Sequence, residues 1–209
     1  MLLMATICVF GDSTAWGAWD LEKGGWVNRL WLYLAEKDKD SEIYNLSISG
    51  GTTETILARF ENEAKIRQAD VLIFQTGGND AAYEHKEDNY LVSPDKFKKN
   101  LEKIIERAKK ITDKIVFIGF KNIDETKTMP VSWREIYYSN ENIKKYNEAM
   151  KGVCAENKVL FLDVFGVLDV QDLDDGLHPN AEGHNKLFQK VKSFLLENKI
   201  INIVFSPVG

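Results

Sequence analysis

Polar clusters follow four apolar runs of this chain, and they contain the residue types that acyl transfer needs. The clusters are Gly11-Asp12-Ser13, Ser47-Ile48-Ser49-Gly50-Gly51-Thr52, Thr76-Gly77-Gly78-Asn79-Asp80 and Asp174-Asp175-Gly176-Leu177-His178-Pro179. Together they supply a hydroxyl, a glycine-rich turn, a carboxamide and a carboxylate–imidazole pair. A nucleophile, a base, a group that orients the base and oxyanion donors are the components of an acyl-transfer site.

Ser13, His178 and Asp175 are the candidate catalytic residues. A serine hydroxyl is a weak nucleophile at neutral pH unless a neighbouring base takes its proton. An imidazole, with an ordinary pKa of about 6.5, suits that task, and a carboxylate holds its tautomer. Asp175 lies three residues before His178, and a turn at Gly176 can fold its carboxylate back onto the ring. Asp172 and Asp174 are rival partners for the ring, but the spacing favours Asp175.

Three N–H groups are the candidate oxyanion donors. We expect them to be the backbone N–H of Ser13, the backbone N–H of Gly50 and the side-chain amide of Asn79, with Gly51 as the alternative to Gly50. Removing one such donor typically slows an enzyme by about 10²–10³. Asp12 and Asp80 are expected mainly to bond nearby backbone. The candidate lining of a substrate pocket comprises Trp16, Gly51, Asp80 and Leu177.

These residues need a scaffold, and the hydrophobic pattern predicts one. Short runs of strand character cover residues 4–10, 42–46, 71–75, 114–120 and 158–162. Most are continuously apolar, which is typical of parallel strands buried on both faces. Helical periodicity is expected over 25–36, 53–68, 140–157 and 181–198, and over a helix that Ser93 caps, with Pro94 as its first residue. The alternation of strands and helices predicts a three-layer α/β/α sandwich around a parallel five-stranded sheet.

In such a sheet, ligands bind beyond the carboxyl ends of the strands, where the four polar clusters stand. The segments 81–92, 121–138 and 163–178 are the longest irregular ones, and long loops of compact domains are usually functional or mobile. Trp133, Tyr137 and Tyr138 in the second of them could border the pocket. The apolar segment 200–205 is expected to be an edge strand or a packed tail.

Composition narrows the classes of protein. The chain has 209 residues and a formal charge of −5, from 27 basic and 32 acidic side chains. A single domain over residues 1–209 is expected. The sequence has no concentration of basic residues of the kind that binds nucleic acid, so we expect no nucleic-acid partner. Cys8 and Cys154 are too few for a disulfide framework and are interpreted as buried thiols. No apolar run is long enough for a membrane span. The apolar residues 1–10 lack the basic region and the cleavage site of a signal peptide, so we expect a cytoplasmic protein. We also expect the protein to need no cofactor.

The four clusters resemble the blocks of the GDSL-type SGNH hydrolase superfamily, in the order in which that family has them. The resemblance spans residues 11–179. It implies a flavodoxin-like sandwich with esterase or lipase activity, Ser13 as nucleophile, and Asp175 and His178 as the rest of the triad. It also implies that Gly50 and Asn79 are oxyanion donors. Thr14 departs from the pattern, because many members carry Leu after the serine.

Several alternatives remain at this point. The same triad could serve an acyltransferase or a sugar O-acetyl esterase instead of a hydrolase of short-chain esters. A metal-dependent hydrolase would use Asp174, Asp175, His178 and His184, although no recognised metal-ligand motif such as HExxH is present. A non-catalytic flavodoxin-like binding module is the third alternative. We expect His85 and His184 to be ordinary structural residues, and the sequence does not indicate an oligomeric state.

Overall fold

Five parallel strands form the central sheet of the computed structural model, which describes residues 5–37 and 41–201. The strands are β1 (Thr6–Gly11), β2 (Glu42–Asn45), β3 (Val71–Gln75), β5 (Ile115–Ile118) and β7 (Leu160–Leu162). Their order across the sheet is β2-β1-β3-β5-β7, and every pairing is parallel. This is the flavodoxin-like order, with its topological switch point between β1 and β3. The predicted sandwich is therefore confirmed.

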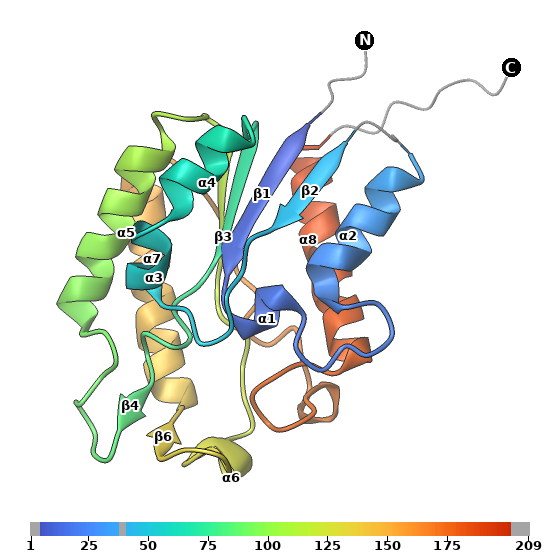
Figure 1. Ribbon diagram of the computed structural model, residues 1–209. Coiled ribbons are helices and arrows are strands. Elements are labelled where there is room, and N and C mark those ends of the chain that lie inside the picture. The colour runs from blue at the N-terminus through green and yellow to red at the C-terminus, as the bar shows by residue number, and fades with distance from the viewer. Residues whose placement is uncertain (1–4, 38–40, 202–209) are drawn as a thin grey trace, which may run out of the picture.

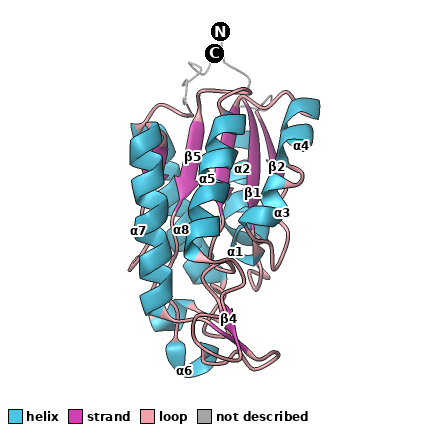
Figure 2. Cartoon of the chain, turned by 90° about the vertical axis from the view of Figure 1, so that its left-hand side faces the viewer, coloured by secondary structure: helices cyan, strands magenta, loops and turns pink. Residues whose placement is uncertain are grey.

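Helices cover both faces of this sheet (Figure 1). One face packs on α2 (Gly25–Ala35) and α8 (Ala181–Glu197). The other packs on α3 (Thr53–Leu57), α4 (Phe60–Ile66), α5 (Pro94–Ala108) and α7 (Asn140–Asn157), and α5 and α7 stand in front of the sheet in Figure 2.

Strand β1 shows why the strand sequences are continuously apolar. Ile7 and Val9 pack with the α2/α8 layer, whereas Cys8 and Phe10 pack with the opposite layer. All four side chains are buried. A strand between two helical layers must bury both of its faces, so the period-two alternation of a half-exposed strand is absent.

The prediction of one continuous helix over residues 53–68 is wrong. The segment 53–68 forms two helices, because α3 ends at Leu57 and α4 begins at Phe60. Arg59 between them leaves helical geometry, with φ −138° and ψ −29°. Its guanidinium donates to the Leu46 carbonyl and lies 5.5 Å from the centre of the Phe10 ring. These tertiary contacts hold the chain in a break that local periodicity does not reveal.

The long segments between elements contain further structure at the carboxyl end of the sheet. Strands β4 (Tyr83–Glu84) and β6 (Ile136–Tyr137) pair antiparallel, although each was expected to be irregular. Short helices α1 (Ser13–Trp16) and α6 (Glu125–Thr128) and a 3₁₀ turn η1 (Val170–Asp172) complete the rim. Of the predicted terminal strand, Ile200 and Ile201 are buried, and 202–205 lie outside the described residues.

Candidate active site

Ser13, His178 and Asp175 form one chain of hydrogen bonds at the switch point of the sheet. Ser13 follows β1 as the first residue of α1, and its Oγ lies 2.8 Å from His178 Nε2. His178 Nδ1 lies 2.7 Å from Asp175 Oδ2. The structure thus brings together three predicted residues from opposite ends of the chain. In the tautomer with a proton on Nδ1, the ring donates to the carboxylate and is free to accept the serine proton.

The turn from Asp175 to His178 holds the carboxylate in place. Asp175 Oδ1 accepts the backbone N–H groups of Leu177 at 2.9 Å and His178 at 2.7 Å. Gly176 has φ +87°, and a Cβ at that position would lie 2.6 Å from Lys127 Cβ, so glycine is required. Burial raises the pKa of Asp175, but the hydrogen bonds and positive charge of His178 outweigh burial and bring the pKa well below its usual range. Asp175 is therefore an anion that can stabilise an imidazolium.

The rival carboxylate Asp172 is engaged elsewhere. It accepts a hydrogen bond from Lys186 Nζ at 2.7 Å and one from the Asp169 backbone at 2.7 Å. Asp174 shares a backbone hydrogen bond with His178, from its N–H to the His178 carbonyl at 2.8 Å. Of the three acidic residues considered from the sequence, Asp175 is the one whose carboxylate is recorded in contact with the His178 ring.

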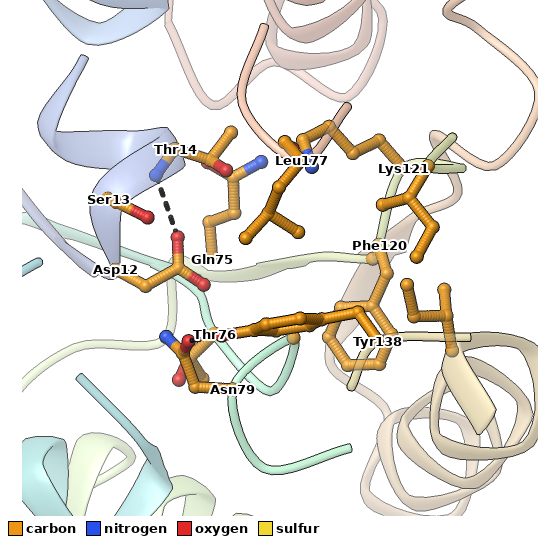
Figure 3. Close-up of a pocket in the computed structure, with 14 residues that line it drawn as sticks. Asp12, Ser13, Thr14, Gln75, Thr76, Asn79, Phe120, Lys121, Tyr138 and Leu177 are labelled. Atoms are coloured by element: carbon orange, nitrogen blue, oxygen red, sulfur yellow. Dashed lines mark hydrogen bonds between the residues drawn. The ribbon is translucent and has the colours of Figure 1, made fainter. Parts of the chain in front are cut away.

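Asp12 caps the short helix α1, which begins at Ser13. Its carboxylate accepts the Thr14 N–H at 2.9 Å, as drawn in Figure 3, and it forms the N-cap of α1. Burial raises the pKa of Asp12. Because the first N–H groups of a helix lack intrahelical acceptors, the cap leaves the Ser13 N–H available. Within residues 5–37 and 41–201 no acceptor is recorded for it.

The oxyanion candidates differ in how free their N–H groups are. Gly51 N–H already donates to the Ile48 carbonyl at 2.9 Å, so Gly51 is a poor alternative donor. Gly50, with φ +75°, is exposed, and the described part of the chain offers its N–H no recorded acceptor. Asn79 Nδ2 donates one hydrogen to the Gly51 carbonyl at 2.9 Å and keeps the other. Tyr138 Oη donates to Asn79 Oδ1 at 2.8 Å, which fixes the orientation of the amide.

Two hollows meet at Ser13. The inner one, of about 40 Å³, is drawn in Figure 3, and its wall includes Asp12, Thr76, Phe120, Lys121 and Ile143. The outer one, of about 180 Å³, includes Gly50, Leu91, Trp133, Arg134 and His178. Both also contain Ser13, Asn79, Tyr138 and Leu177. Ser13 therefore borders both hollows.

The four residues expected to line a substrate pocket differ in where the structure places them. Leu177 lines both hollows, whereas Trp16, Gly51 and Asp80 line neither. Asp80 is fully buried and bonds Thr53, accepting from its hydroxyl and its backbone N–H. Burial raises the pKa of Asp80 to about 7. The carboxyl group of Asp80 thus links the loop after β3 to the start of α3.

Lys121 is a site residue that the sequence analysis missed. It is buried beside the inner hollow, and its Nζ donates to the Leu177 carbonyl. Burial lowers the pKa of Lys121 to about 8, against the opposing effect of Asp12 and Asp175. A signal was available, because Lys121 and Asn122 directly follow the predicted strand 114–120, just as polar residues follow other predicted strands. Tryptophans 19 and 133 also border His178, with ring centres 6.3 Å and 6.0 Å away.

The second histidine of the region has a structural role, as predicted. His184 on α8 is fully buried, with Nε2 2.9 Å from the Ala18 carbonyl and Nδ1 accepting the Trp26 N–H at 3.3 Å. Burial lowers the pKa of His184 to about 4. Both ring nitrogens are occupied, so His184 cannot join Asp174, Asp175 and His178 as a metal ligand. Over the described ranges, no three His, Cys, Asp or Glu side chains gather into a metal-binding group.

Neither cysteine of the chain is available as a reactive thiol. Cys8 and Cys154 are both buried and unpaired in disulfides. Burial raises the pKa of Cys8 to about 11, so Cys8 is a poor nucleophile candidate.

Among the described residues, none of the helices combines the length and apolar character required to cross a bilayer.

The fold and the contacts at its switch point are those of an esterase-type hydrolase. The chain belongs to the GDSL-like lipase/acylhydrolase family, whose model matches residues 9–186. It is 26% identical over 191 residues to the esterase TesA of Pseudomonas aeruginosa, covering 89% of this chain and 85% of that protein. It is 25% identical over 202 residues to the GDSL esterase/lipase WDL1 of Oryza sativa subsp. japonica, covering 90% and 76%.

Solved structures share the fold. A crystal structure of TesA superposes with a TM-score of 0.72 at 24% identity, covering 92% of this chain and 98% of that one. Axe2, an acetylxylan esterase from Geobacillus stearothermophilus, gives a TM-score of 0.72 at 20% identity, covering 97% of each chain. The predicted family, fold and enzyme class are therefore confirmed.

Proposed function

We propose that this enzyme hydrolyses carboxylic esters of short acyl chains, with Ser13 as nucleophile, His178 as general base and Asp175 as the group that orients the base. The observation that carries the proposal is the continuous hydrogen-bonded chain, 2.8 Å from Ser13 Oγ to His178 Nε2 and 2.7 Å from His178 Nδ1 to Asp175 Oδ2. These lengths are within the range of hydrogen bonds that transfer or orient a proton.

The reaction proceeds in two balanced halves. His178 Nε2 takes the Ser13 proton as Oγ attacks the ester carbonyl, and the ionised Asp175 stabilises the imidazolium. The tetrahedral adduct breaks its bond to the alcohol oxygen, which receives the proton from His178. Water then gives a proton to His178 and adds to the acyl group. Collapse of the second adduct returns the proton to Ser13 and releases the acid.

The negative charge of each adduct requires donors that are already in place. The N–H groups of Ser13 and Gly50 and the second amide hydrogen of Asn79 border the outer hollow and supply three. Donors fixed before the reaction need no reorganisation as charge develops, which is the source of their catalytic effect. The Tyr138 hydroxyl, by holding Asn79 Oδ1, keeps the nitrogen side of the amide directed to this task.

The inner hollow supports the short acyl chain. With a volume of about 40 Å³, it has room for about three water-sized atoms. Phe120, Tyr138 and Ile143 border it and limit its extension. An acetyl or propionyl group matches this space, whereas a long chain would have to leave through the outer hollow.

A sugar O-acetyl esterase is the second candidate. Trp133, 56% exposed, borders the outer hollow and its ring lies 6.0 Å from that of His178 at 27°. An exposed aromatic face beside the base suits the flat apolar face of a sugar leaving group. Axe2, which shares the fold, acts on acetylated xylan, and its catalytic mutants replace a serine, an aspartate or a histidine with alanine.

The test of the triad is a fluorophosphonate probe combined with p-nitrophenyl acetate turnover. The native enzyme is expected to be labelled and active, and Ser13→Ala to lose both properties. Ser193→Ala, on the exposed side of α8, is the matched control and should keep both. Labelling of Ser13→Ala at the native rate, or retention of most of its turnover, would rule out Ser13 as the nucleophile.

Substrate chemistry needs its own measurement. With p-nitrophenyl esters of increasing length, kcat/KM should be highest for acetate or propionate and fall steeply at octanoate. Acetylated xylo-oligosaccharides test the second candidate, and product analysis with added alcohols detects acyl transfer. A preference for octanoate would contradict the assignment of the inner hollow.

A further inference from the structure

Trp19 makes a contact that the triad chemistry does not require. Its indole Nε1 donates to Asp175 Oδ2 at 2.9 Å, the same oxygen that lies 2.7 Å from His178 Nδ1. Trp19 is 51% exposed, although burial of a large aromatic side chain is usually favourable. Its backbone also has φ +66°, in the left-handed region that residues with a Cβ rarely adopt. An exposed, strained tryptophan aimed at the triad carboxylate calls for an explanation.

The segment that carries Trp19 is fixed on both sides. On one side, buried His184 bonds the Ala18 carbonyl at 2.9 Å. On the other, Asp20 accepts Arg29 Nε at 2.9 Å and the Gly25 N–H at 2.9 Å. Arg29 Nη2 also donates to the Ala181 carbonyl at 3.1 Å, which joins the segment to the start of α8. The backbone around Trp19 is therefore anchored to both helices of one layer.

Close backbone packing tightens the same segment. A Cβ on Gly17, whose φ is +101°, would lie 2.2 Å from the Gly24 carbonyl oxygen, and one on Gly25 would lie 2.3 Å from Gly17 Cα. The two ends of the loop therefore touch, and only glycine permits that approach. A loop closed in this way, with ion-paired and buried anchors, presents the indole in one place.

We propose that Trp19 is a positioning residue for the triad, which acts by holding Asp175 Oδ2 in the place from which it orients the His178 ring. This inference rests on the proposed function of the triad. The carboxylate then receives four donors. Oδ1 takes two backbone N–H groups, and Oδ2 takes the indole and the imidazole. With both oxygens fixed, the carboxylate cannot rotate about its Cβ–Cγ bond when the imidazolium forms.

The indole also affects charge. A donor on Oδ2 withdraws negative charge from the carboxylate, and its loss should strengthen the hold of Asp175 on the imidazolium proton. The acid side of the activity profile would then move to higher pH. The other charged or titratable groups around the pair are Asp12, Lys121, Arg134 and Tyr138, and a change at Trp19 leaves all four in place.

The variant Trp19→Phe removes the N–H and keeps a ring. We expect the pH-independent kcat for p-nitrophenyl acetate to fall by about 5- to 10-fold, with KM changed by less than about twofold. The acid midpoint of kcat should rise by about half a pH unit. Trp31→Phe, a partly exposed tryptophan of α2 outside both hollows, is the control and should change neither quantity. Thermal unfolding of both variants shows whether they fold.

A double-mutant cycle identifies the partner through which Trp19 acts. Against an Asp175→Ala background the contact no longer exists, so Trp19→Phe should cost less than about twofold in kcat. An equal loss in both backgrounds, or a loss confined to KM, would show that Trp19 acts on the substrate and would overturn the inference. An unchanged kcat and pH profile in Trp19→Phe alone would do the same.

These outcomes are separable from failure of the proposed function. If Ser13→Ala abolishes probe labelling and turnover while Trp19→Phe behaves like the native enzyme, the triad stands and the positioning role falls. If Ser13→Ala stays active, the triad assignment itself fails, and the positioning role falls with it.

Discussion

The two halves of the proposed catalytic site rest on opposite helical layers, and the layers support them with different chemistry. Asp175, His178 and Trp19 depend on the α2/α8 layer through the Asp20–Arg29 ion pair and buried His184. The oxyanion half, around Asn79, depends on the α3/α5/α7 layer. There the supports are the Tyr138 hydroxyl and the bonds of Thr53 to Asp80 and Asn100.

The difference follows from what each half must hold. The acid–base half must keep a carboxylate ionised and immobile, and hydrogen bonds to a charged group are roughly twice as strong as neutral ones. The oxyanion half must only keep neutral N–H groups aimed at a charge that appears during the reaction. We therefore expect damage to the first half to cost more activity than damage to the second.

His178→Ala removes the proposed base from the acid–base half and should give the largest loss of kcat. With no base for Ser13 and no partner for Asp175, kcat for p-nitrophenyl acetate is expected to fall by about 10⁴ or more. His85→Ala is the control, because His85 is an exposed loop residue that pairs with Glu135 at 3.1 Å. If His178→Ala kept more than about a tenth of native kcat, the acid–base role of this half would be disproved.

Asn79→Ala changes the oxyanion half and should reduce kcat by less than His178→Ala does. It removes one of three donors, so kcat is expected to fall by about 10²–10³ with little change in KM. Asn62→Ala, at an exposed position of α4, is the matched control. A loss as large as that of His178→Ala would erase the proposed difference between the halves.

Buried His184 in one half and buried Asp80 in the other should change the free energy of unfolding with pH in opposite directions. The pKa of His184 is lowered to about 4, so between pH 6.5 and 4 the unfolded chain binds the proton that the folded chain refuses. The free energy of unfolding should therefore fall as pH falls. At pH 5 the loss that comes from His184 should be about 2 kcal/mol relative to neutral pH. Urea unfolding of the native enzyme and of His184→Gln at pH 7 and pH 5 measures it, and equal pH dependence in both would refute the assignment.

Asp80 in the other half has the reverse sign. Its pKa is raised to about 7, so the folded chain keeps a proton that the unfolded chain has lost above about pH 4. Its contribution to stability is present below pH 4 and is lost as pH rises to about 7. Comparing Asp80→Asn with the native enzyme over that window should show a flatter slope in the variant.

The sequence predicts the strands and the residues that meet at Ser13, because both have local signatures. The run Val71–Gln75 and the helix Asn140–Asn157 have the predicted bounds, since continuous apolar character and helical periodicity are properties of neighbouring residues. The break at Arg59 and the pairing of β4 with β6 depend on contacts between distant segments. The contacts of Lys121 with Leu177 and of Trp19 with Asp175 could not be predicted for the same reason, because these partners lie far away in the chain.

Tyr138→Phe offers the finest test of the comparison. It removes only the hydroxyl that donates to Asn79 Oδ1 at 2.8 Å, while the ring stays on the wall of both hollows. A neutral hydrogen bond contributes about 1 kcal/mol, so kcat should fall by about fivefold, with KM unchanged. Tyr137→Phe is the control, because Tyr137 stacks on Tyr83 and lines neither hollow. Since the hydroxyl acts through the amide, the same change in an Asn79→Ala background should have no further effect, and an additive loss would mean that Tyr138 contacts the substrate directly.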